Sequence, residues 1–154
     1  MKLRLSVLLI VLAAALLVIG SVAAQDDTFA LTILHTNDTH AAHQPNNDGD
    51  GGVAREATVV KQVRAEGGNL LLVDAGDRFT GTLFHRLYLG QDQVEIMNLL
   101  GYDVMTLGNH EFDNGEDVLL AFLQGLDFPA VSSNINFGNG PLANEVSPYA
   151  VLEV

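Results

Sequence analysis

The chain has 154 residues, 48% of them apolar, which is enough for one domain with a hydrophobic core. Its formal net charge of −12 makes it a poor non-specific ligand for nucleic acids or anionic lipids, and it would repel a phosphate substrate unless bound cations reversed the local charge. Cysteine is absent, which excludes disulfide scaffolds and lipobox lipidation and leaves only oxygen and imidazole ligands for any metal.

The N-terminus has the pattern of an export signal. A basic start precedes an apolar run over residues 5–19, and small residues follow as far as Ala24. This order predicts a secretory signal peptide over residues 1–24, followed by a short linker at residues 25–30. The alternative is an uncleaved anchor, because the apolar stretch is just long enough to span a bilayer. We expect an exported protein, periplasmic, at the cell surface or extracellular, with no membrane contact after cleavage.

Short apolar runs alternate with helical patterns along the rest of the chain. Apolar residues at helical spacing, ended by glycine, predict the helices, and compact apolar runs predict the strands. Such alternation predicts an α/β fold with mainly parallel strands and helical crossovers. The predicted strands lie at residues 31–34, 70–73, 104–107 and 130–132, and the predicted helices at residues 53–66, 91–100 and 115–125.

The last apolar run, residues 149–154, predicts a further strand with no return connection. Because a domain seldom ends within a strand, we expect residues 31–154 to form one domain truncated at its C-terminal end. The alternative is a short domain whose last strand happens to be terminal. Four or five strands would leave a sheet edge and an apolar face uncovered, and both favour aggregation.

Polar residues follow three of the predicted strands. Ligand sites in open parallel sheets form at the carboxyl ends of strands, so these residues should meet at one edge. The three clusters lie at residues 38–40, 76–77 and 108–113.

The first cluster contains Asp38 and His40, two residues apart. In an extended segment, side chains at that spacing point to the same face, so a carboxylate and an imidazole could hold one divalent cation there. This pair alone is a weak signal, since an aspartate and a histidine in a loop are common.

The second cluster places Asp77 directly after Gly76. Its carboxylate could bridge two cations about 3.5–4 Å apart, the spacing of two-metal sites. The alternative is an aspartate that caps a helix or turn. Asp74 competes for the bridging role, but we favour Asp77 because Gly76 allows a tight backbone turn before it. Asp74 is then expected to be structural.

The third cluster contains Asn109, His110 and Asp113. An asparagine oxygen is a neutral metal ligand, which would limit the negative charge of the site. In a helical turn, residues three apart are neighbours, so Asp113 could fix the tautomer of His110 and support its charged form. The alternatives are that His110 is a metal ligand and that Asp113 caps the helix that begins near residue 115.

Together the clusters are more specific than any one alone. The chain resembles the calcineurin-like metallophosphoesterases, whose signature D-x-H, G-D and G-N-H-[DE] occurs here in order at residues 38–40, 76–77 and 108–111. The surrounding words resemble the secreted 5′-nucleotidase and UDP-sugar hydrolase family at residues 34–40, 51–55, 74–77 and 108–113. The resemblance covers nearly all of residues 31–154. It implies the N-terminal half of a layered α-β-β-α sandwich.

The resemblance also implies a role for each site residue. His110 and Asp113 would form a catalytic dyad that stabilises the phosphoryl transition state or the leaving group. Two divalent cations, drawn from Mn, Zn, Mg, Co and Fe, would be bound. Their ligands would be Asp38 and His40 for the first cation, Asp77 for both and Asn109 for the second.

The chain departs from the family after the third cluster. The family supplies further histidines, a lone one and a later G-H-x-H motif, and a C-terminal domain that binds the nucleoside, but no histidine follows His110 here. The implied reaction is hydrolysis of a small-molecule phosphoester, with nucleotides favoured and nucleic-acid polymers excluded. The alternatives are a non-catalytic metal- or ligand-binding remnant, or an esterase of cyclic nucleotides, sugar nucleotides or sulfur esters.

Overall fold

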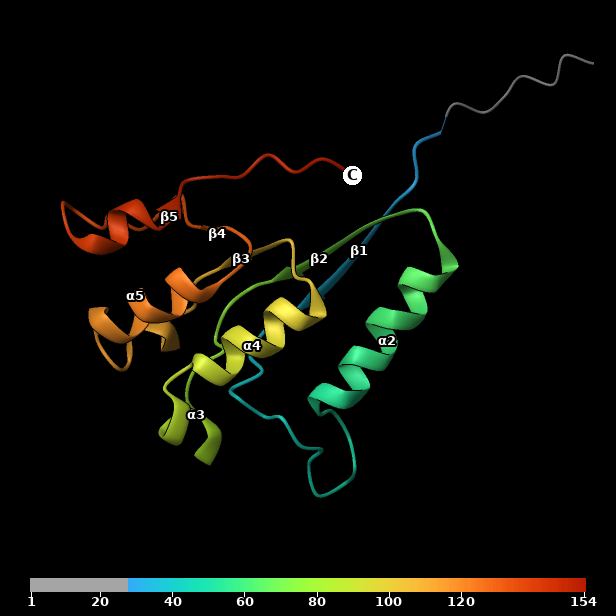
Figure 1. Ribbon diagram of the computed structural model, residues 1–154, viewed down its shortest axis with the longest axis horizontal. Coiled ribbons are helices and arrows are strands. Elements are labelled where there is room, and N and C mark those ends of the chain that lie inside the picture. Colours follow the sequence, from blue (N-terminus) through green and yellow to red (C-terminus); the bar gives the residue numbers. More distant parts are fainter. Residues whose placement is uncertain (1–27) are drawn as a thin grey trace, which may run out of the picture.

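The computed structural model describes residues 28–154, so the predicted signal peptide lies outside the described residues. Five strands form one parallel sheet in chain order (Figure 1). They are β1 (Leu31–Thr36), β2 (Asn69–Asp74), β3 (Val104–Thr106), β4 (Ala130–Val131) and β5 (Val146–Ser147). The other elements are helices α2 (Val53–Glu66), α3 (Leu83–Tyr88), α4 (Gln91–Leu100) and α5 (Glu116–Gly125), and the 3₁₀ turns η1 (His110–Phe112) and η2 (Pro141–Asn144). The predicted α/β fold with parallel strands is confirmed.

The two faces of the sheet differ in burial. Parallel register places Leu72, Met105 and Ala130 on the face that joins the hydrophobic core with side chains of α2, α4 and α5. These helices gather along one side of the strands in Figure 1. Ile33 belongs to the opposite face and is 57% exposed. The described residues therefore form one helical layer and one sheet of the expected layered sandwich, and none of their helices has the length and apolar character needed to cross a membrane.

The predicted helices at residues 53–66 and 91–100 match α2 and α4 residue for residue, and the predicted helix at 115–125 begins one residue later, at Glu116. Helix α3, the two 3₁₀ turns and β5 were not predicted. The signal for α3 is short. It consists of six residues between Thr82, which is extended, and Leu89, which ends the helix in a left-handed conformation.

The predicted strand at residues 149–154 is wrong. The last strand is β5, and residues 149–154 have no regular secondary structure. Two features explain this. The partner strand β4 offers only Ala130 and Val131 for pairing. Pro148 then follows directly after Ser147, and proline has no N–H with which to continue a ladder.

Candidate metal centre

The chain after β1 runs beside the chain after β2, although neither segment is a strand there. The backbone N–H of Asp38 donates to the carbonyl of Gly76 (2.9 Å), and the N–H of His40 donates to the carbonyl of Asp77 (3.0 Å). These bonds place the first predicted cluster next to the second. The backbone conformation of each segment therefore depends on hydrogen bonds to the other segment, so the sequence of either segment alone does not reveal it.

The expectation that Asp38 and His40 lie in an extended segment is wrong. Both residues have left-handed backbones, with φ of 51° and 48°, because their N–H groups bond to the turn after β2. The two side chains still approach each other, since Asp38 Oδ1 lies 3.9 Å from His40 Nε2. Asp77 is also left-handed, with φ of 58°. Non-glycine residues in this conformation store strain of about 1–3 kcal/mol each and cluster at functional sites.

Two glycines let the turns after β2 and β3 touch. Gly76 has φ of 93°, and a Cβ atom there would lie 2.2 Å from the backbone nitrogen of Gly108. A Cβ atom on Gly108 would lie 2.2 Å from Asp77 Oδ1. No side chain fits at either position, so the second and third clusters meet through bare backbone.

Three side chains converge at this edge of the sheet. Single ligand atoms of His40, Asp77 and His110 all lie within 4.8 Å of one another. The imidazole rings of His40 and His110 meet edge to face, with centroids 4.9 Å apart. His40 Nδ1 lies 3.1 Å from the carbonyl oxygen of Phe79, so it can donate there and leave Nε2 for another partner. One carboxylate and two imidazoles fit Mn, Zn, Fe or Co, and the residues present therefore suit a divalent cation.

Two further predicted ligands, Asp38 and Asn109, are neighbours of these residues in the chain. The Asp38 carboxylate is 58% exposed and accepts a hydrogen bond of 2.6 Å from the Asn37 amide. Asn109 is exposed, precedes His110 at the start of η1, and accepts the N–H of Phe112 through its backbone carbonyl. The structure thus brings His40, Asp77 and His110 together, with Asp38 beside His40 and Asn109 directly before His110 in the chain.

His110 and Asp113 form the expected pair. Residues 110–112 form a 3₁₀ turn, and His110 Nδ1 lies 2.7 Å from Asp113 Oδ2. The hydrogen bond to Asp113 raises the pKa of His110 and outweighs desolvation, which acts in the opposite direction. Helix α5 is capped by Gly115, so the alternative that Asp113 caps it is wrong. Nε2 of His110 stays open to another partner, and both roles considered for this histidine are compatible with the geometry.

A buried charge network beneath the cluster was not anticipated. Arg78 is 1% exposed and donates to the Asp74 carboxylate (2.9 Å), to the hydroxyl of Thr36 (2.8 Å) and to the Tyr102 hydroxyl. Burial opposes the charge of Arg78, but Asp74, Tyr102 and Glu56 outweigh it and raise its pKa. Burial also raises the pKa of Tyr102. Asp74 is thus buried and bonded to Arg78, which agrees with the structural role expected for it. No sequence motif identified Arg78.

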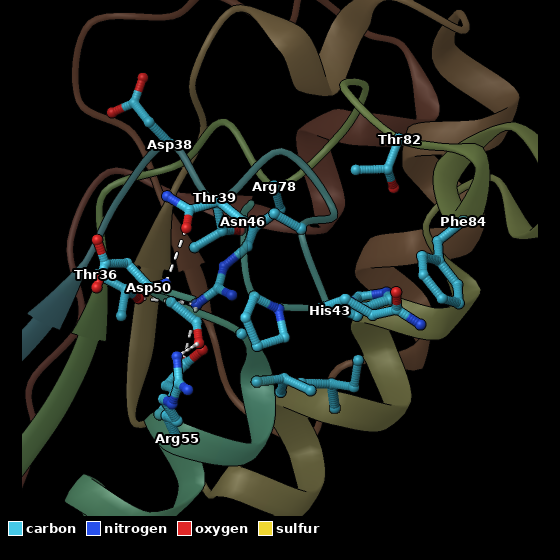
Figure 2. Close-up of a pocket in the computed structure, with 18 of the residues that line it drawn as sticks. Thr36, Asp38, Thr39, His43, Asn46, Asp50, Arg55, Arg78, Thr82 and Phe84 are labelled. Atoms are coloured by element: carbon cyan, nitrogen blue, oxygen red, sulfur yellow. Dashed lines mark hydrogen bonds and ion pairs between the residues drawn. The ribbon is translucent and has the colours of Figure 1, made fainter. Parts of the chain in front are cut away.

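A hollow of about 840 Å³ adjoins the first cluster. Figure 2 shows it between Arg55 of α2 and Phe84 of α3, with Asp38 at its rim. The loop after β1 forms part of the wall and is tied to α4 by a bond of 2.5 Å between His43 Nε2 and Asp92 Oδ2. Of the predicted ligands, Asp38 lines this hollow, while His40, Asp77 and Asn109 do not.

The structure is a parallel sheet with helices, and carboxylate and imidazole side chains gather at the carboxyl edge of this sheet. The chain therefore has the features of α/β proteins whose ligand site, here a candidate metal centre, lies at that edge. Comparison with known families narrows the class. Residues 31–153 match the calcineurin-like phosphoesterases, and the chain belongs to this family. Proteins of this family use divalent metals, in agreement with the candidate site.

Several characterised relatives are 5′-nucleotidases. The chain is 46% identical over 141 residues to the snake venom 5′-nucleotidase of Naja atra, covering 82% of this chain and 26% of that protein. It is 45% identical over 142 residues to the 5′-nucleotidase of Rattus norvegicus, covering 82% and 24%. The chain thus spans about a quarter of the length of these relatives.

Solved structures show the same fold. The 5′-nucleotidase precursor of Thermus thermophilus superposes with a TM-score of 0.73 at 42% identity, over 79% of this chain and 26% of that one. The NAD nucleotidase (NadN) of Haemophilus influenzae gives a TM-score of 0.72 at 34% identity, over 80% and 24%.

Proposed function

We propose that this domain takes part in metal-dependent hydrolysis of a phosphoester, with small nucleotides as the substrate class. The convergence of His40, Asp77 and His110 within 4.8 Å is the observation on which the proposal depends. The names of the relatives support the substrate class, since two curated relatives and one solved structure are 5′-nucleotidases. The net charge of −12 makes a nucleic-acid polymer an unsuitable partner.

We propose that two divalent cations occupy the site, from the set Mn, Zn, Mg, Co and Fe. When bound, such cations neutralise phosphate oxygens and lower the pKa of a water nucleophile. Asp77 would be shared by the two cations, because its carboxylate has two oxygens and one of them lies within 4.8 Å of a ring nitrogen of His40. The proposed ligands are Asp38, His40 and Asp77 for one cation and Asp77 and Asn109 for the other.

The proposed catalytic role of His110 follows from its pairing. Asp113 occupies Nδ1 and raises the pKa of the ring, so a larger fraction of the imidazole is protonated near neutral pH. Nε2 can then donate a proton or a hydrogen bond to the leaving oxygen. Asp113 holds the ring in orientation, as the carboxylate does in other histidine–carboxylate pairs.

We further propose that the protein is exported, with residues 1–24 as signal, residues 25–30 as linker and residues 31–154 as part of the phosphoesterase domain. The basic start and apolar run of the N-terminus support this proposal. The substrate would then be an extracytoplasmic small molecule.

One observation favours a second candidate function, metal binding without catalysis. Within residues 28–154, the proposed ligands give one cation three donor residues and the other two, fewer than the four donors of a closed site. Incomplete coordination weakens metal binding and leaves the nucleophile poorly held.

Phosphate release distinguishes the two candidates. The purified chain, and a chimera in which it replaces the matching N-terminal segment of the Thermus thermophilus enzyme, would be incubated with Mn²⁺ and a nucleoside 5′-monophosphate. We expect Mn²⁺-dependent release in the chimera that falls at least about 10²-fold in His110→Ala, by analogy with the loss of a single electrostatic stabiliser. Mn²⁺ binding with no release in either protein would support the non-catalytic candidate.

A further inference from the structure

Glu111 is a fully buried carboxylate with no assigned role in the proposed chemistry. It lies in η1 directly after His110 and is 0% exposed. Within residues 28–154, no cationic side chain forms an ion pair with it. A buried, unpaired carboxylate is costly unless hydrogen bonds compensate it, so its partners must explain its presence.

Four backbone N–H groups supply that compensation. Oε2 accepts from Asp77 (2.9 Å) and Gly108 (2.7 Å), and Oε1 accepts from the two residues that follow Asp77, namely Arg78 (2.7 Å) and Phe79 (3.3 Å). Three consecutive N–H groups of the turn after β2 therefore converge on one anion, which is the geometry of a backbone nest. Hydrogen bonds to an ionised acceptor are roughly twice as strong as neutral ones.

These bonds join the turn after β2 to the turn after β3. The connection is reciprocal, since Asp77 Oδ1 accepts the N–H of His110 (2.9 Å) while Glu111 accepts the N–H of Asp77. We propose that Glu111 is the positioning residue that sets the Asp77 carboxylate and the His110 imidazole at their working separation. This inference rests on the proposed function, which gives the reason for holding these two side chains at a fixed separation. Glu111 acts entirely through the backbone and touches neither substrate nor metal.

The substitution Glu111→Gln tests this role. Each carboxylate oxygen accepts two N–H groups, so an amide in either orientation would point its NH₂ at two donors. The matched control is Leu119→Ala, which opens a cavity at the buried face of α5 and removes none of the hydrogen bonds between the two turns. Both variants would be compared with the full chain, metal-free for hydrogen exchange by NMR and with Mn²⁺ for calorimetry.

In Glu111→Gln, we expect amide hydrogen exchange to become faster by about tenfold or more at the four N–H groups that donate to Glu111. The increase should be much smaller at the N–H groups of Leu72 and Met105 in the sheet. The Mn²⁺ dissociation constant should rise by about 10–100-fold, the usual effect of losing a group that orients a ligand. Leu119→Ala should quicken exchange throughout the core and leave the Mn²⁺ constant unchanged.

Uniform exchange changes in Glu111→Gln, or an unchanged Mn²⁺ constant, would overturn the positioning role. If Glu111→Gln does not fold, hydrogen exchange in the unsubstituted chain tests the role instead. The four N–H groups that donate to Glu111 should then be protected from exchange at least as well as those of Leu72 and Met105. Rapid exchange at these four groups would overturn the role. Failure of the proposed function has a different signature, namely no phosphate release in the chimera, which leaves the exchange result intact.

Discussion

Asp77 Oδ1 accepts a hydrogen bond of 2.9 Å from the backbone N–H of His110, although Asp77 and His110 are 33 positions apart in the chain. The same bond orients the carboxylate and fixes the start of the turn that holds the imidazole. Glycine at position 108 leaves space for it, since a Cβ atom there would lie 2.2 Å from Asp77 Oδ1. The proposed metal ligand is therefore also a structural link between two strand ends.

Replacement of Asp77 separates these two roles. In Asp77→Asn the amide oxygen can still accept the His110 N–H, so the fold should be kept, but the negative charge is lost. We expect Mn²⁺ affinity to fall by at least about tenfold, measured by calorimetry. Asp117→Asn, on the exposed face of α5, is the control and should bind as the unmodified chain does. Equal affinities in both variants would contradict the proposed ligand role.

Asp113 should control the titration of His110. Because Asp113 raises the pKa of His110, Asp113→Asn should lower it toward its ordinary value. The stabilisation from the charged ring is complete below the ordinary pKa of about 6.5 and is lost as pH rises through the raised folded value, so the two proteins should differ more in stability at acid pH than at alkaline pH. NMR titration of the metal-free protein measures the shift. An unaltered His110 titration would show that the pair does not set it.

Gly76 should tolerate no side chain. Gly76→Ala would incur the strain of a left-handed alanine, about 1–3 kcal/mol, and an overlap with the Gly108 backbone that costs a further amount of about 1–3 kcal/mol. Gly49→Ala is the matched control, because Gly49 also has a positive φ (84°) but nothing within 4 Å of an added Cβ. Urea unfolding should therefore show a clearly larger loss at position 76, and equal losses would contradict the close approach of the two turns.

Arg78 should be essential for stability although it lies outside the proposed chemistry. Arg78→Met leaves the buried Asp74 carboxylate without its cation, a change that typically costs about 3–5 kcal/mol. Arg55→Met, on the exposed surface of α2, should change the free energy of unfolding by no more than about 0.5 kcal/mol. Chemical denaturation of both variants measures the difference, and a loss at Arg78 as small as that at Arg55 would show that the network contributes little.

The sequence determined most of the secondary structure and the sheet edge at which the three clusters meet. Apolar residues at helical spacing identified α2, α4 and α5, and compact apolar runs identified four of the five strands, because these patterns reflect which side chains a local element must bury. The meeting of the three clusters followed from one rule, that parallel strands end at the same edge. The proposed roles of Asp38, His40, Asp77 and Asn109 as ligands, and of His110 and Asp113 as a catalytic pair, stay predictions.

Only the tertiary structure decided how the site is held. The left-handed backbones of Asp38 and His40, the N–H groups around Glu111 and the Arg78 network depend on partners at least 22 residues away in the chain. The exceptions are two short links, from Glu111 to Gly108 and from Arg78 to Asp74. The absent strand at residues 149–154 has the same cause, since an apolar run becomes a strand only where a neighbour offers free N–H and C=O groups. Local sequence specifies which groups can bond, and the assembled fold decides which of them do.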